Sequence, residues 1–182
     1  IIFKWRMMKL QWNIAKSVKQ VICLSTVVIF GCLPFSLSAQ EAPPKPIIIY
    51  ANPAQGLHFG TFTHGPSGGT VIIYPNGTRS VTGSVVQLSS GTPFSPAIFE
   101  VEANLGTVVS ILNGPNITLT GSNGGSMLMQ IGASSTGSPF ITNVAPPGRT
   151  QVRIGGTLFV GSALANPGGN YSGTFMVTFI QE

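Results

Sequence analysis

The sequence predicts an all-β protein, built as an antiparallel β-sandwich and preceded by a cleaved signal peptide. Beyond a basic and then apolar opening segment, short runs rich in β-branched and aromatic residues recur about every ten residues, with Gly, Pro, Ser and Asn between them. No long stretch shows the apolar period of an amphipathic helix. Regularly spaced short strands separated by turn residues are typical of two packed antiparallel sheets.

The opening segment, residues 1–39, is expected to be a signal peptide. Its lysines precede an apolar run over residues 21–30, and the small residues of Ser36–Ala39 follow. A basic region, a short apolar region and a small residue at the cleavage point define such a signal. The apolar run is too short for a comfortable membrane span. Cleavage after Ala39 would export the rest of the chain.

Two further features of this segment bear on export. Met8 is the expected start, which makes residues 1–7 an upstream extension of the reading frame. Ile29–Cys32 offers an alternative, because it loosely resembles a lipoprotein cleavage box and would leave a lipid on Cys32. The bulky Phe30 disfavours that alternative, so we expect contact with a membrane only through the export signal.

The basic character of the chain belongs to the signal. The whole chain carries a formal net charge of +5, but only four basic residues and four Glu follow Ala39, so that their charges cancel (4 − 4 = 0). Nucleic-acid binding needs a clustered basic face. The exported part has no such cluster in its sequence, so we expect no nucleic-acid partner. Both cysteines, Cys23 and Cys32, also precede the cut, which removes disulfide and thiolate chemistry from the exported part.

After the cut we expect a proline-rich leader over residues 40–46, QEAPPKP, and a single β-sandwich domain over residues 47–182. The Asn76-Gly77 pair lies between two strand-like runs and predicts a hairpin with positive φ at both central positions. The Gly-Gly pairs at 68–69, 124–125, 155–156 and 168–169 are interpreted as turns. The expected strands are Ile47–Tyr50, Leu57–Thr63, Thr70–Tyr74, Thr78–Thr82, Ser84–Leu88, Ala97–Ala103, Thr107–Leu112, Asn116–Thr120, Met127–Ile131, Thr150–Ile154, Thr157–Gly161 and Asn170–Ile180.

The two terminal strands have distinct patterns. In Asn170–Ile180, apolar and polar residues alternate, which places one row of side chains on the core face. Three consecutive isoleucines make Pro46–Ala51 too apolar to remain in solvent, so we expect it to pair as an edge strand, within its own domain or with a neighbouring copy. Pairing within its own domain is favoured, because the last strand already suffices to complete a sandwich.

Two histidines and two glutamates are the groups best able to take part in chemistry. His58 and His64 lie in GLHFGTFTHGPSGGT, where His58 points outward and His64 belongs to the turn. A zinc site needs three or four ligands, so we expect two surface histidines and no metal. The glycines of this stretch lack the lysine of a phosphate-binding loop. Glu100 and Glu102 share the solvent face of one strand, without the cleft that a glycosidase places between its carboxylates. We therefore expect no catalytic residue, no cofactor and no enzyme activity.

Arg79 is the polar residue of greatest interest. It directly follows the Asn76-Gly77 turn in the stretch PNGTRS. It either caps backbone carbonyls of a neighbouring loop or binds an anionic ligand. The first role is favoured, because a guanidinium presents several donors in a fixed fork that suits carbonyl groups in turns.

Four blocks of sequence show a family resemblance. They are LHFGTF, GGTVIIYPNGTRSVTG, IGGTLFVG and PGGNYSGTFMVTF, in this order between Leu57 and Phe179. Together they resemble the bacterial family called domain of unknown function 4402. More distantly, the first and last blocks are similar to spore coat U proteins and to fimbrial subunits. The resemblance implies an exported Ig-like or pilin-like β-sandwich in a Gram-negative bacterium, without an established activity.

These observations predict an exported, non-catalytic structural or adhesive protein of the bacterial surface or envelope, located in the periplasm, on the outer surface or in the medium. One alternative is a fimbrial subunit that assembles by strand addition. Such subunits often have a Gly fourteenth from the end and an alternating last strand, and Gly169 and the run Asn170–Ile180 resemble that pattern, although Gln181 replaces the penultimate Tyr. The other is a carbohydrate-binding module, which would need exposed aromatic platforms such as Tyr50, Tyr74 or Tyr171. The expected partners are other copies of the chain, surface proteins or glycans.

Overall fold

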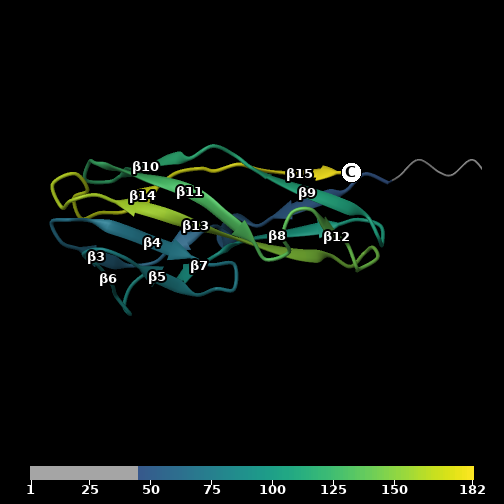
Figure 1. The fold of residues 1–182 in the computed structure, drawn as a ribbon, viewed down its shortest axis with the longest axis horizontal. Helices are drawn as coiled ribbons and strands as arrows, with labels where there is room; N and C mark the ends of the chain where they lie inside the picture. The colour runs from purple at the N-terminus through teal and green to yellow at the C-terminus, as the bar shows by residue number, and fades with distance from the viewer. Residues whose placement is uncertain (1–44) are drawn as a thin grey trace, which may run out of the picture. The chain divides into compact units, whose positions relative to one another are not determined.

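The computed structural model of the chain describes residues 45–182, which Figure 1 draws in colour. The predicted signal peptide and most of the leader lie outside the described residues. Residues 45–182 form one compact unit. Its elements are β1 (Ile48–Ala51), a 3-10 helix η1 (Pro53–Gln55), β2 (His58–Phe59), β3 (Phe62–His64), β4 (Gly69–Ile73), β5 (Arg79–Val81), β6 (Val85–Gln87), β7 (Phe94–Ser95), β8 (Ala97–Glu102), β9 (Val108–Asn113), β10 (Ile117–Gly121), β11 (Ser126–Ser134), β12 (Phe140–Ile141), β13 (Thr150–Val160), β14 (Tyr171–Ser172) and β15 (Val177–Gln181).

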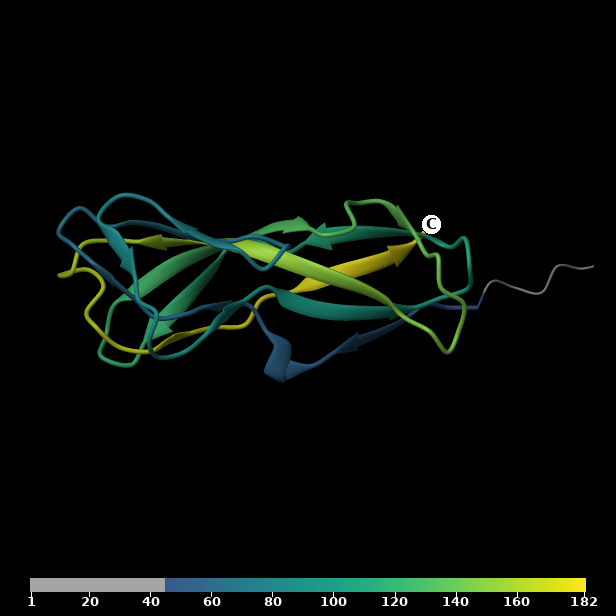
Figure 2. The same cartoon turned by 90° about the horizontal axis from the view of Figure 1, so that it is seen from below.

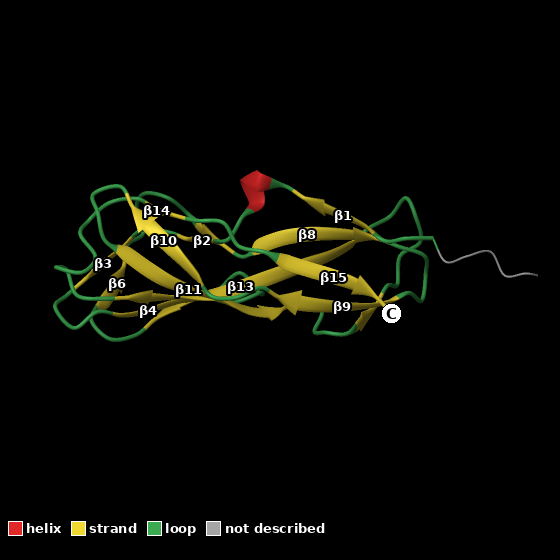
Figure 3. Ribbon diagram, turned by 90° about the horizontal axis from the view of Figure 1, so that it is seen from above, coloured by secondary structure: helices red, strands yellow, loops and turns green. Residues whose placement is uncertain are grey.

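The strands form one large sheet and three smaller ones, and every pairing between these strands is antiparallel. The large sheet has the order β1-β8-β13-β11-β10-β14, while β4 pairs with β13 and with β5. The smaller sheets are β12-β9-β15, β2-β7 and β3-β6. Figure 3 shows β1, β8, β9 and β15 toward one end and β3, β4, β6 and β14 toward the other. The predicted antiparallel all-β fold is confirmed, and the described part of the chain holds no helix with the length and apolar character that a membrane crossing requires.

One hydrophobic core lies between the layers. Its most deeply buried side chains alternate along the central strands, as the period of two requires; they include Val71, Ile73, Val101, Val152 and Ile154. Phe99 of β8 packs against Phe175 and Phe179, with ring centroids 6.5 Å and 5.5 Å apart. These ring contacts join the large sheet to the segment that contains β15.

Strand β13 corrects the expectation of a turn at Gly155-Gly156. Residues Thr150–Ile154 pair with β8, and Gly156–Val160 pair with β4 along the same strand. The core-facing positions keep a period of two across both glycines, so the chain never turns. A Cβ on Gly155 would lie 2.2 Å from the carbonyl oxygen of Ile73. The glycine pair therefore allows a close approach of two backbones, in place of the predicted turn.

The last run, predicted as one strand over Asn170–Ile180, is instead two strands in two sheets. Strand β14 pairs with β10 at Thr120 and Gly121, and β15 pairs with β9. The alternation of half-buried and exposed side chains holds across Phe175 and Val177 to Phe179, as predicted. Local sequence specified which side chains face the core, but the change of sheet depends on β9 and β10, which lie far away along the chain.

One strand prediction and one turn prediction also need correction. The expected strand Leu57–Thr63 is interrupted at Gly60, whose φ is +73°, and becomes β2 and β3. The Asn76-Gly77 hairpin joins β4 to β5 as predicted. Its φ is positive at Gly77 only, because a loop of several residues replaces the two-residue turn, with hydrogen bonds from the Tyr74 amide to the Thr78 carbonyl and from the Gly77 amide to the Tyr74 carbonyl.

The edge strand expected over Pro46–Ala51 is present as β1. It pairs with β8 of the same chain from Ile48↔Glu102 to Ala51↔Phe99. The Ile47 amide donates to the side-chain oxygen of Gln181, 3.2 Å away, so that the first described residues and the C-terminus lie at the same end (Figure 2). In the described structure the strand therefore pairs within its own domain.

Candidate functional site

The two histidines differ in their surroundings. His58 is exposed on β2, as predicted. His64 was expected in a turn at the surface, and this is wrong: it ends β3, is half-buried, and its Nε2 lies 3.0 Å from the carbonyl oxygen of Asn166. Within residues 45–182, no group of three or more His, Cys, Asp or Glu side chains is arranged to hold a metal ion. The contact of His64 joins the end of β3 to the loop that contains Asn166.

Asn166 is the structural residue that sequence reasoning missed. Its side chain is buried, with Oδ1 accepting from the Gly161 amide and Nδ2 donating to the carbonyl oxygens of Ser126 and Ala165. A buried amide needs such partners, because an unsatisfied polar group in the interior is costly. The proline and glycines that follow Asn166 indicated a turn, but nothing local indicated that its side chain would tie that turn to β11.

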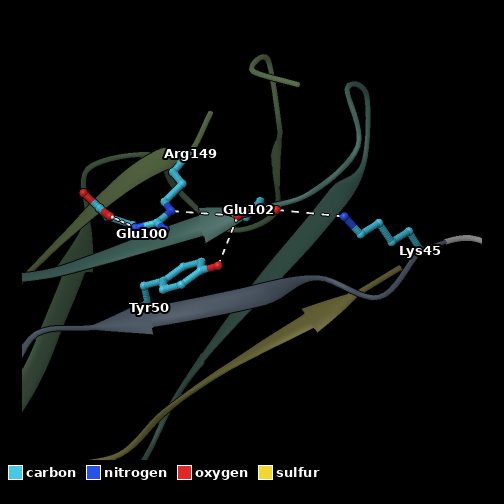
Figure 4. A network of polar contacts seen from close by, with 5 residues as sticks. All are labelled: Lys45, Tyr50, Glu100, Glu102 and Arg149. Atoms are coloured by element: carbon cyan, nitrogen blue, oxygen red, sulfur yellow. Dashed lines mark hydrogen bonds and ion pairs between the residues drawn. The ribbon is translucent and has the colours of Figure 1, made fainter. Parts of the chain in front are cut away.

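The two glutamates belong to a cross-strand network (Figure 4). Glu100 and Glu102 of β8 lie between β1 and the start of β13, on the outer face of the large sheet. The guanidinium of Arg149 lies 2.9 Å from Glu100 and 3.9 Å from Glu102, and it stacks 3.5 Å from the ring centre of Tyr50. Lys45 lies 3.9 Å from Glu102, and the Tyr50 hydroxyl donates to Glu102 over 3.1 Å.

This network corrects the expectation that both glutamates face solvent. The Glu102 side chain is only 13% exposed, against 40% for Glu100. The hydrogen bond to Glu100 is the largest of the effects that raise the pKa of Arg149. Because the guanidinium therefore stays protonated, Arg149 stops contributing to the network only in strongly alkaline solution. Two carboxylates that lie side by side on one strand and share cations do not flank a substrate, as glycosidase carboxylates do. The arrangement suits the fastening of β1 to β8.

Arg79 is surrounded by acceptors from two segments, Phe59–Thr61 and Gln87–Leu88. Its Nη1 donates to the carbonyl oxygens of Phe59 and Thr61, at 3.1 Å and 3.2 Å, and its Nη2 donates to that of Leu88 at 3.2 Å. Its Nε donates to the Gln87 side chain at 3.0 Å, and the guanidinium lies 4.5 Å from the ring centre of Phe94. Burial lowers the pKa of Arg79, yet a guanidinium stays protonated at neutral pH.

The approach of Arg79 explains the glycine at the break between β2 and β3. A Cβ on Gly60 would lie 2.6 Å from Nη1 of Arg79 and 3.1 Å from Cβ of Phe94. Gly60 also has a positive φ, which side chains with a Cβ rarely adopt. The block LHFGTF and Arg79 thus form one unit, in which the guanidinium binds the carbonyls on either side of Gly60. The Thr61 carbonyl also accepts from the Leu88 amide.

Replacing Arg79 with Ala is expected to lower the free energy of unfolding by about 2 kcal/mol or more, because three carbonyls lose a charged donor. Arg79→Lys should recover only a small part, since an ammonium cannot reach all three carbonyls at once. Urea unfolding followed by circular dichroism measures both. Arg153→Ala is the matched control, because Arg153 is exposed and its side chain donates only to Gln151 among the described residues. Equal stability of the Arg79 and Arg153 variants would contradict the capping role.

A groove of about 490 Å³ opens at the end that holds β2, β3 and β14. Residues 56–62 and 167–175 contribute to its walls. Its floor is continuous with the core and includes Leu119, Met129 and Leu158.

Comparison with known proteins relates this chain to one family. The model of a family described as Domain of unknown function (DUF4402) matches residues 49–180, which run from β1 to β15. No curated protein and no solved structure matches the chain.

Proposed function

Because this chain belongs to the DUF4402 family, whose activity is not established, we propose from its own residues that it is an exported, non-catalytic structural or adhesive module of the bacterial envelope. The observation that supports this most directly is the use of its reactive side chains. Glu100 and Glu102 pair with Arg149, Arg79 caps carbonyls, and His64 bonds to a backbone oxygen. General acid–base catalysis needs such groups directed at a substrate.

The outer surface supports the same proposal. Charged residues are scarce, and exposed positions on the strands are frequently Thr, Ser, Gln or apolar side chains such as Leu128 and Phe159. A surface of this kind is suited to contacts with other macromolecules, because few charges need to be desolvated when a partner binds. The predicted signal over residues 1–39 supplies the route out of the cytoplasm.

Export is tested by expressing the full chain in a Gram-negative host and separating cytoplasm, periplasm, outer membrane and medium. We expect the protein outside the cytoplasm, with an N-terminus at Gln40 by mass spectrometry, because Ala39 provides the small residue that cleavage requires. A charged residue placed in the apolar run, Val27→Asp, should retain the uncleaved chain inside the cell. An uncleaved wild-type chain in the cytoplasm would contradict the proposal.

Strand addition between copies is the second candidate, and β1 favours it. This strand lies at the edge of the large sheet, bound by one ladder to β8. Ile47 and Ile49 pack against the core, while Ile48 is 42% exposed. A strand that inserts alternate side chains and uses backbone hydrogen bonds is the kind of element that one copy can donate to another. Continued donation from copy to copy would produce an open filament.

A further inference from the structure

A second hollow lies on the outer face of the large sheet, beside the β4–β5 loop. It measures about 540 Å³ and is lined by Tyr74, Pro75, Asn76, Ser135, Gln151 and Arg153. It forms where β13 exchanges β8 for β4 as its neighbour. At this point Pro75 lies over Gly155, where a Cβ would be 3.2 Å from Cδ of the proline.

In this hollow the side-chain oxygens of Asn76 and Gln151 already accept hydrogen bonds within the protein, whereas several donor groups remain available. The side-chain oxygen of Asn76 accepts from the amide and the hydroxyl of Thr78, at 3.0 Å and 2.7 Å. The side-chain oxygen of Gln151 accepts from Nε of Arg153 at 3.0 Å. The NH₂ groups of Asn76 and Gln151 and the terminal nitrogens of Arg153 are left to donate. The hollow therefore selects a ligand rich in acceptors.

The charge of the hollow is positive. Among residues 45–182, Arg153 forms no ion pair, whereas Lys45 and Arg149 pair with the glutamates of β8. Glu100 is the cross-strand partner of Gln151 and is the carboxylate nearest in register, but it bonds to Arg149 at 2.9 Å. A guanidinium with free terminal nitrogens binds a carboxylate through two parallel hydrogen bonds.

Tyr74 adds an apolar platform to these donors. It is 42% exposed, and its hydroxyl lies 3.2 Å from the Ser80 hydroxyl. The other two tyrosines of the described chain are engaged elsewhere: Arg149 covers the ring of Tyr50, and Tyr171 is half-buried with its hydroxyl bonded to the Pro167 carbonyl. Tyr74 is thus the tyrosine with a ring face available for stacking against the C–H groups of a sugar.

From this juxtaposition we infer that the hollow binds a carboxylated sugar, with the carboxylate on Arg153, the ring against Tyr74, and hydroxyl oxygens accepting from Asn76 and Gln151. The inference deepens the adhesive role proposed above and rests on it. The loop that presents Tyr74 and Asn76 is held by its own hydrogen bonds, so that little order is lost on binding. An acidic polysaccharide at a cell surface would offer such residues repeatedly.

Isothermal titration of the purified protein with trigalacturonic acid and with sialyllactose tests the site, against their methyl esters and neutral lactose. We expect at least one of the two acids to bind at least about 10-fold more tightly than its ester, because the ester loses the charge-assisted bonds. Arg153→Gln and Tyr74→Ala should each weaken that binding by at least about 10-fold. Lys45→Gln, which removes a charge outside the hollow, should leave it unchanged, and thermal melting confirms that each variant is folded.

Several results would overturn the inference. They are the absence of binding to both acids, equal binding of acid and ester, full affinity in the Arg153 and Tyr74 variants, and equally tight binding of a poly-glutamate peptide. The export experiment separates this inference from the proposed function. A protein that is exported but binds neither sugar loses the sugar site and keeps the envelope role, whereas a cytoplasmic protein loses the envelope role whatever it binds.

Discussion

Replacing Gly155 with Ala is expected to destabilise the protein by more than about 3 kcal/mol, or to prevent folding, because the added methyl group would collide with backbone. The new Cβ would lie 2.2 Å from the carbonyl oxygen of Ile73 and 3.2 Å from its carbonyl carbon. Ile73 cannot withdraw alone, since it pairs with Gly156 and its side chain is 1% exposed in the core. The whole β4–β13 ladder must shift.

Two other glycines provide a graded comparison for Gly155. A Cβ on Gly156 would lie 2.7 Å from the end of the Leu57 side chain and 3.0 Å from the Gln130 carbonyl oxygen, so part of that clash can be relieved by rotating Leu57. A Cβ on Gly168 would meet no atom within 4 Å, and its φ is not positive. Substitution at such an open surface position usually changes stability by less than about 0.5 kcal/mol.

Differential scanning calorimetry of the three alanine variants measures this order. We expect Gly155→Ala to lower the melting temperature by more than about 10 °C or to give no folding transition, Gly156→Ala to have a smaller effect, and Gly168→Ala almost none. A Gly155→Ala variant that melts with the wild-type protein would contradict the close backbone approach. The Gly156 and Gly168 variants keep the comparison informative if the Gly155 variant fails to fold.

Removing β1 is expected to have the second largest effect. A chain that starts at Gln55 loses the half-buried side chains of Ile47 and Ile49, and it uncovers Phe99 and Val101 of β8. Complete burial of one such side chain contributes about 1.5 to 3 kcal/mol, so the loss should reach at least about 3 kcal/mol. Chemical unfolding of the two forms measures the difference, with the chain that starts at Gln40 as reference.

A peptide of residues 45–52 tests whether β1 can be donated from outside. Added to the chain that starts at Gln55, it should raise the melting temperature further as its concentration increases, because it binds the folded state only. An Ile49→Asp peptide should fail, since Ile49 packs against the core, whereas an Ile48→Asp peptide should still bind, since Ile48 is 42% exposed.

The mass of these proteins in solution decides how β1 is used. Monomers of the chain that starts at Gln40 would show that β1 pairs within its own domain, as in the structure. Polymers would place strand addition first among the functions. Equal stability and mass for both starting points would show that β1 has no part in folding or assembly, which would contradict the packing of Ile47 and Ile49.

Local sequence was sufficient to predict the fold class and most strands. In β10 and in the second half of β8, the alternation of apolar and polar residues indicates both the strand and its core face, because the side-chain period of a strand is two. The β4–β5 hairpin follows from Asn76-Gly77 in the same way. These features depend on residues that are close in sequence, and the family resemblance, now shown over residues 49–180, depends on the same blocks.

Tertiary structure decided what depends on partners far away along the chain. Gly155 lies within a strand, where the backbone of Ile73 approaches too closely for a Cβ. The last run divides into two strands because its halves pair with β10 and with β9. The acceptors of Arg79 and the bond between His64 and Asn166 likewise join separate segments. The hollow beside Tyr74 follows the same logic, because β13 brings Gln151 and Arg153 to a loop more than seventy residues earlier. Composition and spacing specify which side chains face the core, but only the pairing of strands specifies which surface groups meet.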